Sequence, residues 1–166
     1  HLDPVLAACK ARKHIMLEKP MALTLEECDQ MIVAAKEAGV KFTVGHLLRF
    51  NQRIVRAHYK IQSGEIGAVR HFYARRNMPR TAPRHVGDCC GFHSMLYHGA
   101  VHELDLIQWL ANDEIIEAYA KYQAGQMESE GCGVSDTILA LLQFRNGAQA
   151  LTEHSWIYPD NFPAMV

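Results

Sequence analysis

The segment Glu18-Lys19-Pro20 places a lysine where a buried strand is predicted to end. It follows the short apolar run His14-Ile15-Met16-Leu17. Proline fixes φ and has no backbone N–H to donate, so the strand stops before Pro20 and presents Lys19. In an open α/β sheet the carboxyl ends of the strands face the crevice that binds ligands. An ammonium group there can stabilise negative charge on a substrate oxygen, whereas a solvated surface pair of Glu18 and Lys19 is the alternative.

A predicted helix over residues 94–111 carries a polar stripe on a mostly apolar surface. At 100° per residue, the stripe consists of His98, His102, Asp105 and Trp109. The histidines either bond to neighbouring carbonyl groups in a core or bind zinc, with Asp105 as a third ligand or as a support for the rings. The helix lacks the H-E-x-x-H pattern of metallohydrolases, and a zinc site would leave Lys19 unexplained. An imidazole also titrates near neutral pH, which suits proton exchange with a hydroxyl group.

The elements that must position these groups follow from periodicity, capping residues and turn signals. Thr24 and Gly39 are typical of the two ends of one helix, and Asn146-Gly147 of a two-residue hairpin turn. Helices are predicted at 3–13, 24–38, 51–63 and 94–111, and strands at 14–17, 41–45, 69–76, 115–122, 135–145 and 148–157, with a long polar stretch at 77–95.

This order of elements resembles the Gfo/Idh/MocA family (glucose-fructose oxidoreductase and inositol dehydrogenase-like proteins) from about Val5 to Pro159. Its most specific matches are Glu18-Lys19-Pro20 and His102-Glu103-Leu104-Asp105. The resemblance implies an α/β fold. Residues 1–47 would end a Rossmann-type dinucleotide-binding domain, and residues 48–166 would form the first part of an α+β substrate-binding and oligomerisation domain. The open, mostly antiparallel sheet of that second domain would be covered by another subunit, so we expect a homo-oligomer.

The family is one of nicotinamide-dependent sugar and polyol oxidoreductases, so the resemblance implies roles for single residues. His102 would be the catalytic acid and base, and Asp105 would orient its ring. Lys19 would donate to the substrate oxygen, and the Lys19-Pro20 bond would be cis. His98 stands where the family usually has an aspartate. An imidazole cannot replace a permanent carboxylate, although it can still exchange hydrogen bonds with a sugar hydroxyl, so substrate choice is expected to differ.

The implied ligands are NAD or NADP and a small sugar, polyol or sugar derivative. Glu18, Lys19 and Pro20 would contact the cofactor. The residues expected to bind the substrate are Lys19, Arg49, His98 and Asp105.

The glycine-rich dinucleotide fingerprint is absent. None of the 11 glycines forms a G-x-G-x-x-G turn between a strand and a helix. In the resembled family this turn lies in the first part of a longer chain, so we expect these residues to be an internal fragment that is inactive alone. A catalytically silent binding or assembly protein with the same fold is the alternative function.

The amino-acid composition restricts the classes of partner that the protein is expected to bind. A net charge of −1 and a pI near 6.9 provide no general attraction to nucleic acid or to an anionic membrane. No apolar run is long enough for a transmembrane helix. The 5 cysteines show no C-x-x-C spacing, which favours reduced thiols and a cytoplasmic protein.

Four arginines lie close together in the segment from Arg75 to Arg84. They suit either a solvated loop or the binding of a phosphorylated or nucleotide-linked sugar, because guanidinium groups bind phosphate oxygens in pairs. The vicinal Cys89-Cys90 in the same polar stretch has no assigned mechanism.

Overall fold

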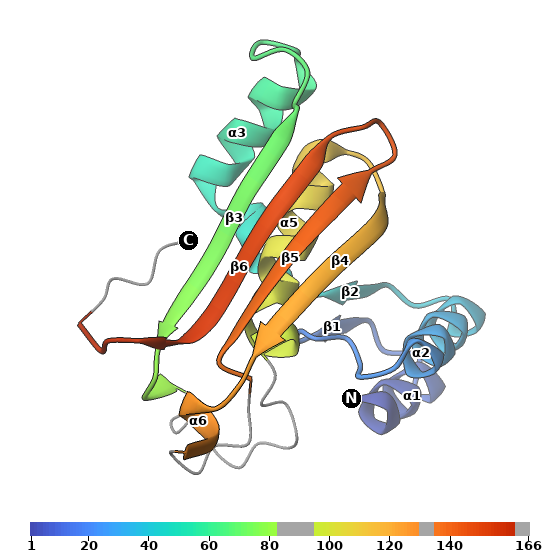
Figure 1. Ribbon diagram of the computed structural model, residues 1–166. Helices are drawn as coiled ribbons and strands as arrows, with labels where there is room; N and C mark the ends of the chain where they lie inside the picture. Colours follow the sequence, from blue (N-terminus) through green and yellow to red (C-terminus); the bar gives the residue numbers. More distant parts are fainter. Residues whose placement is uncertain (83–94, 130–134, 162–166) are drawn as a thin grey trace. The chain divides into compact units, whose positions relative to one another are not determined.

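Two units, His1–Leu47 and Leu48–Val166, make up the chain (Figure 1). The structure is a computed structural model and describes residues 1–82, 95–129 and 135–161. The vicinal Cys89-Cys90, Arg84 and residue 94 therefore lie outside the described residues. Among the described residues, no helix is long and apolar enough to cross a membrane.

The first unit is a layer of two helices on a pair of parallel strands. Its elements are α1 (Leu2–Lys10), β1 (Ile15–Leu17), α2 (Leu25–Ala38) and β2 (Phe42–Val44). Parallel strands need a crossover between them, and α2 is that crossover, with Ile15 opposite Phe42 and Leu17 opposite Val44. Val5, Cys9, Met31 and Ala35 are buried between the helices and the strands. This is the predicted Rossmann-type arrangement.

Helix α2 begins and ends at the residues that its sequence indicates. The Thr24 hydroxyl accepts a hydrogen bond from the Glu27 backbone N–H at 3.2 Å. The Glu27 carboxylate accepts from the Leu23 N–H at 3.4 Å, one residue before the position that a capping box uses. Gly39 ends the helix at φ 65°, a left-handed conformation that glycine adopts without a steric cost.

The second unit is a four-stranded sheet with helices on one face. Its elements are the 3-10 turn η1 (Leu47–Phe50), α3 (Gln52–Gln62), β3 (His71–Pro79), the π-helical turn η2 (Leu96–Ala100), α5 (Val101–Ala111), β4 (Ile115–Gln123), α6 (Gln126–Ser129), β5 (Thr137–Phe144) and β6 (Gln149–Tyr158). The strand order is β3-β6-β5-β4, in which β3 and β6 are parallel and the other pairs antiparallel. The predicted open, mostly antiparallel sheet is confirmed (Figure 1).

Helix α5 packs on one face of this sheet. Ile107 on the helix joins Leu142 and Phe144 of β5 in a buried cluster that also contains Ala148, directly before β6, and Ala150 within β6. The alternation of apolar side chains along β5 and β6 turns these residues toward the helix, as the strand period requires. Figure 1 shows α5 crossing the sheet on the same side as α3.

The opposite face of the sheet carries a row of exposed apolar side chains. Tyr73 lies opposite Leu151, Leu151 opposite Leu141, and Leu141 opposite Tyr119, so the row crosses all four strands. Each of these side chains is at least 46% exposed. A contiguous apolar surface of this kind is typical of an interface.

The structure corrects three predicted boundaries. Strand β3 continues to Pro79, beyond the predicted end at residue 76, because the polar side chains at its end find partners. The β5–β6 connection has three residues, Arg145-Asn146-Gly147, between Phe144 and Ala148, whose backbone groups bond at 2.8 Å. A glycine with positive φ, here 90°, is typical of the third position of such a turn. The helix predicted at 94–111 is divided at residue 100 into the π-turn and α5.

Replacing Thr24 by Ala is expected to weaken α2. The variant leaves the Glu27 N–H without its side-chain acceptor, and the unfolding free energy should fall by about 1 kcal/mol. Denaturant titration of the 166-residue chain measures the loss, with Thr24→Ser as the matched control that keeps the hydroxyl. Equal stability of the alanine variant and the parent would contradict the cap.

Candidate active site

Lys19 stands at the carboxyl edge of the parallel strands of the first unit. β1 ends at Leu17, and the bond between Lys19 and Pro20 is cis, as the resemblance implies. At the end of the neighbouring strand, Gly45 is buried, and a Cβ there would lie 3.4 Å from the Leu17 carbonyl and 3.8 Å from a Glu18 carboxylate oxygen. The two strand ends therefore meet closely, and this edge presents Glu18 and Lys19 together.

The two candidate histidines lie on either side of the boundary between the π-turn and α5. His98 lies within the turn and its ring is 5.4 Å from that of Trp156, a residue of β6 that is only 1% exposed. His102 lies in the first turn of α5 and is half-buried. The His98 ring therefore contacts β6 at Trp156, and its place in the site stays a prediction.

Asp105, on the same helix as His102, is bound by Arg49. The Arg49 Nε and Nη2 donate to the two carboxylate oxygens at 2.8 and 2.5 Å. The guanidinium also lies 5.8 Å from the centre of the Trp109 ring, and the His58 ring stacks on that ring at 3.9 Å. The side chains expected to bind substrate, Arg49 and Asp105, are therefore brought together as an ion pair. The role of Asp105 in orienting His102 stays a prediction.

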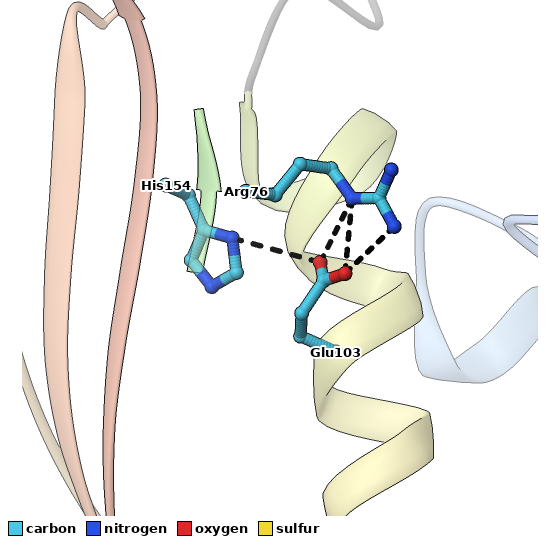
Figure 2. A network of polar contacts seen from close by, with 3 residues as sticks. All are labelled: Arg76, Glu103 and His154. Atoms are coloured by element: carbon cyan, nitrogen blue, oxygen red, sulfur yellow. Dashed lines mark hydrogen bonds and ion pairs between the residues drawn. The ribbon is translucent and has the colours of Figure 1, made fainter. Parts of the chain in front are cut away.

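Glu103 is a site residue that sequence reasoning missed. It is 3% exposed, and its carboxylate binds Arg76 of β3 through Nε at 3.0 Å to each oxygen and through Nη2 at 2.7 Å (Figure 2). His154 of β6 approaches from the other side, with Nδ1 3.8 Å from a Glu103 oxygen. The sequence did contain a signal for this contact, namely an acidic residue on a mostly apolar helix. If such a residue is buried, its charge needs a partner.

The same contact corrects the interpretation of the arginine-rich segment. Arg75 and Arg76 lie in β3, within the strand predicted at 69–76, and the Arg76 guanidinium is bound by Glu103 and so is not solvated. Arg76 is therefore engaged inside the protein. The remaining described arginine of this segment, Arg80, follows the strand and is exposed.

His154 is held neutral by its surroundings. Burial, together with the positive charge of Arg76, lowers its pKa from 6.5 to about 4, while the charge of Glu153 opposes the change. Among the described residues, neither ring nitrogen of His154 has a hydrogen-bond partner. A neutral imidazole beside the ion pair leaves the charges of Arg76 and Glu103 to balance each other.

The structure assigns the predicted site residues to two different units. Lys19, with Glu18 and Pro20, belongs to His1–Leu47, whereas Arg49, His98, His102 and Asp105 belong to Leu48–Val166. No group of three or more metal-ligating side chains occurs within residues 1–82, 95–129 and 135–161. The zinc interpretation of the histidines therefore gains no support from the described part of the chain.

Comparison with protein families matches both units. The model described as "Oxidoreductase family, NAD-binding Rossmann fold" matches residues 1–46, and the one described as "GFO/IDH/MocA C-terminal domain" matches residues 54–165.

Curated relatives cover nearly the whole chain. A 2,7-anhydro-N-acetylneuraminate hydratase from Escherichia coli K12 is 34% identical over 98% of this chain and 44% of its own length. A 1,5-anhydro-D-fructose reductase from Ensifer adhaerens is 34% identical over 90% of this chain and 45% of its own. The chain therefore spans less than half the length of these relatives.

Solved structures have the same fold. An aldose-aldose oxidoreductase from Caulobacter crescentus, complexed with glycerol, is similar with a TM-score of 0.84 and 26% identity, over 96% of this chain and 48% of that one.

Acid is expected to destabilise the second unit through His154. The unfolded chain protonates this histidine below pH 6.5, whereas the folded chain does so only near pH 4. Because the unfolded state binds more protons in that window, stability falls as the pH drops through it, by about 3 kcal/mol in all. Denaturant titrations between pH 7 and pH 4 measure the slope.

The matched control for this titration is His154→Phe, which removes the ionisable ring. Its unfolding free energy should depend less on pH than that of the parent over the same window, whatever its absolute stability. Parallel pH profiles for the two proteins would show that His154 does not titrate with a depressed pKa.

Proposed function

Since the chain belongs to the GFO/IDH/MocA family of oxidoreductases, we propose a hydride-transfer function for the protein that carries it. This protein transfers a hydride between NAD or NADP and a secondary alcohol of a sugar, polyol or sugar derivative. The observation that carries the proposal is the position of Lys19 at the carboxyl end of β1, in a chain whose second unit presents His102 on α5. The relatives named as a sugar reductase and an aldose-aldose oxidoreductase support the substrate class.

The edge formed by β1 and β2 suits a nicotinamide cofactor. Ligands of open α/β sheets bind outside the carboxyl ends of the parallel strands, and β1 and β2 end side by side here, with Leu17 opposite Val44. Glu18, Lys19 and Pro20 are the residues that would hold the cofactor here. When bound, the nicotinamide accepts or supplies the hydride.

Lys19 and His102 have different roles in the proposed reaction: Lys19 stabilises negative charge, and His102 transfers the proton. The Lys19 Nζ donates a hydrogen bond to the reacting oxygen and stabilises the alkoxide character that develops as its proton leaves. A ring nitrogen of His102 accepts that proton during oxidation and returns it during reduction. Asp105 lies on the same helix as His102 and binds Arg49 of η1, and both side chains can also meet substrate hydroxyls.

A second candidate reaction is the addition of water. Two relatives, one at 34% and one at 30% identity, are named as hydratases of an anhydro sugar acid. The same lysine and histidine would then donate and accept protons without net oxidation. Activity assays therefore need two readouts, NAD(P)H absorbance and the gain of one water in the product mass.

The exposed face of the four-stranded sheet supports a homo-oligomer. Tyr73, Leu151, Leu141 and Tyr119 form an apolar row that a second copy would cover. At its side, Glu153 accepts hydrogen bonds from the hydroxyls of Tyr73 and Tyr158 at 2.7 and 2.9 Å, so the charge at this face is already solvated by protein groups.

Lys19→Ala and His102→Ala are each expected to lower turnover by about 10²-fold or more. The first removes the ammonium group and the second the proton acceptor. Steady-state rates with both cofactors, across sugars, polyols and nucleotide-sugars, measure the loss in the protein that carries this chain. Lys10→Ala, in the exposed last turn of α1, is the control for the loss of a lysine. Full activity of His102→Ala would remove this histidine from its role, and an inactive parent would favour the silent relative.

His98→Asp is expected to change which substrate is used. The substitution restores the carboxylate that the family usually has at this position, and a carboxylate accepts hydrogen bonds from hydroxyls more strongly than a neutral imidazole. The variant should gain activity on plain polyols such as inositol and lose it on the native compound. An unchanged ratio of kcat/KM values between the two substrate classes would show that His98 does not select the substrate.

A further inference from the structure

Arg76 contacts the two helical segments that carry the candidate histidines. Its guanidinium binds Glu103, the residue that follows His102 in α5. Its side chain also packs against the π-turn, where a Cβ on Gly99 would lie 3.2 Å from the Arg76 Cδ. Gly99 directly follows His98. One arginine on β3 therefore touches the neighbour of each imidazole.

The π-turn has no spare room at this contact. A Cβ on Gly99 would also lie 2.7 and 2.8 Å from the Cε and Sδ of Met95, and Met95 and Gly99 are both buried. Contacts below 3 Å are repulsive, so a larger residue at position 99 would require the end of the Met95 side chain to shift. The segment between His98 and His102 thus contacts Arg76 at Gly99 and is followed by Glu103, which binds the same arginine.

The ion pair between Arg76 and Glu103 is not expected to contribute much to the free energy of unfolding by itself. The Arg76 and Glu103 side chains are 17% and 3% exposed, so both lose most of their hydration on folding. Replacing such a pair by apolar side chains is often neutral or stabilising, whereas a bidentate pair fixes distance and direction at once. The geometry here, with both carboxylate oxygens bound to one guanidinium, restricts rotation of α5 about its axis.

We propose that Arg76 and Glu103 are positioning residues, which together fix the π-turn and the first turn of α5 and so set the relative orientation of His98 and His102. The consequence of this positioning for catalysis rests on the proposed function. The structural part of the proposal, that the ion pair sets the orientation of the two imidazole rings, is independent of that function because both rings lie within one unit.

The structural part is tested by NMR on the 166-residue chain. Ring signals and titration midpoints of His98 and His102 are compared in the parent, Glu103→Gln, Arg76→Lys and the double variant Arg76→Met with Glu103→Leu. The proposal expects both imidazoles to shift in all three variants. Ile107→Ala is the matched control, because this buried residue lies one turn further along the same face of α5 and packs on the sheet without taking part in the ion pair.

The double variant separates positioning from stability. Its apolar side chains are expected to recover the melting temperature that the single variants lose, while the ring signals of His98 and His102 stay displaced. Recovery of the parent ring signals together with the melting temperature would overturn the proposal. So would ring shifts of equal size in Ile107→Ala, since they would follow from destabilisation alone.

The catalytic part is tested in the protein that carries this chain. Glu103→Gln and the double variant should lower kcat about 10- to 100-fold with KM little changed, because misplaced catalytic groups cost rate before they cost binding. Arg76→Lys, which keeps the charge, should lose less. Unchanged kcat in the double variant would contradict the positioning role. An inactive parent would contradict the proposed function instead, and the NMR comparison would still decide whether the pair positions the rings.

Discussion

A buried ion pair between Arg76 of β3 and Glu103 of α5 fixes how the helix lies on the sheet in the second unit. A charge that loses its hydration stays in place only while a partner compensates it, so α5 cannot rotate or slide without leaving both groups unpaired. The neutral His154 ring beside them offers no substitute charge. The rest of α5 follows from this constraint: Ile107 meets the apolar sheet residues one turn later, and His102 lies next to the anchored position.

The regular elements were predictable wherever local chemistry decides the structure. Thr24 and Gly39 mark the ends of α2 because a side-chain cap and a left-handed glycine act within a few residues. The π-turn was not predictable, since the sequence of residues 96–100 keeps a helical pattern and the contact of Gly99 with Arg76 joins residues distant in sequence. Strand β3 was predicted too short for a similar reason. The polar residues after Arg76 suggested a loop, yet Asn77 continues the strand and donates a hydrogen bond to Glu153.

The candidate site was also predictable only where local sequence decides the structure. Lys19 and His102 could be found from motifs, because a lysine before proline at a strand end and a histidine on an apolar helix are visible locally. Their neighbours depend on contacts between residues distant in sequence. Arg49 and Asp105 are 56 residues apart, and Arg76 and Glu103 are 27 apart, so no periodicity could pair them. Glu103 was overlooked because a single acidic residue on a helix usually faces solvent, whereas here it is buried.

The central claim is that Lys19 and His102 both take part in the proposed reaction, Lys19 through its ammonium group and His102 through its ring. A crystal structure of the protein that carries this chain, with NAD(P) and a polyol or sugar bound, tests it most directly. The account predicts that the Lys19 Nζ and a His102 ring nitrogen both lie within about 2.6–3.2 Å of the same hydroxyl oxygen. A bound substrate whose reacting hydroxyl contacts neither group, or only one of them while the other faces solvent, would contradict it.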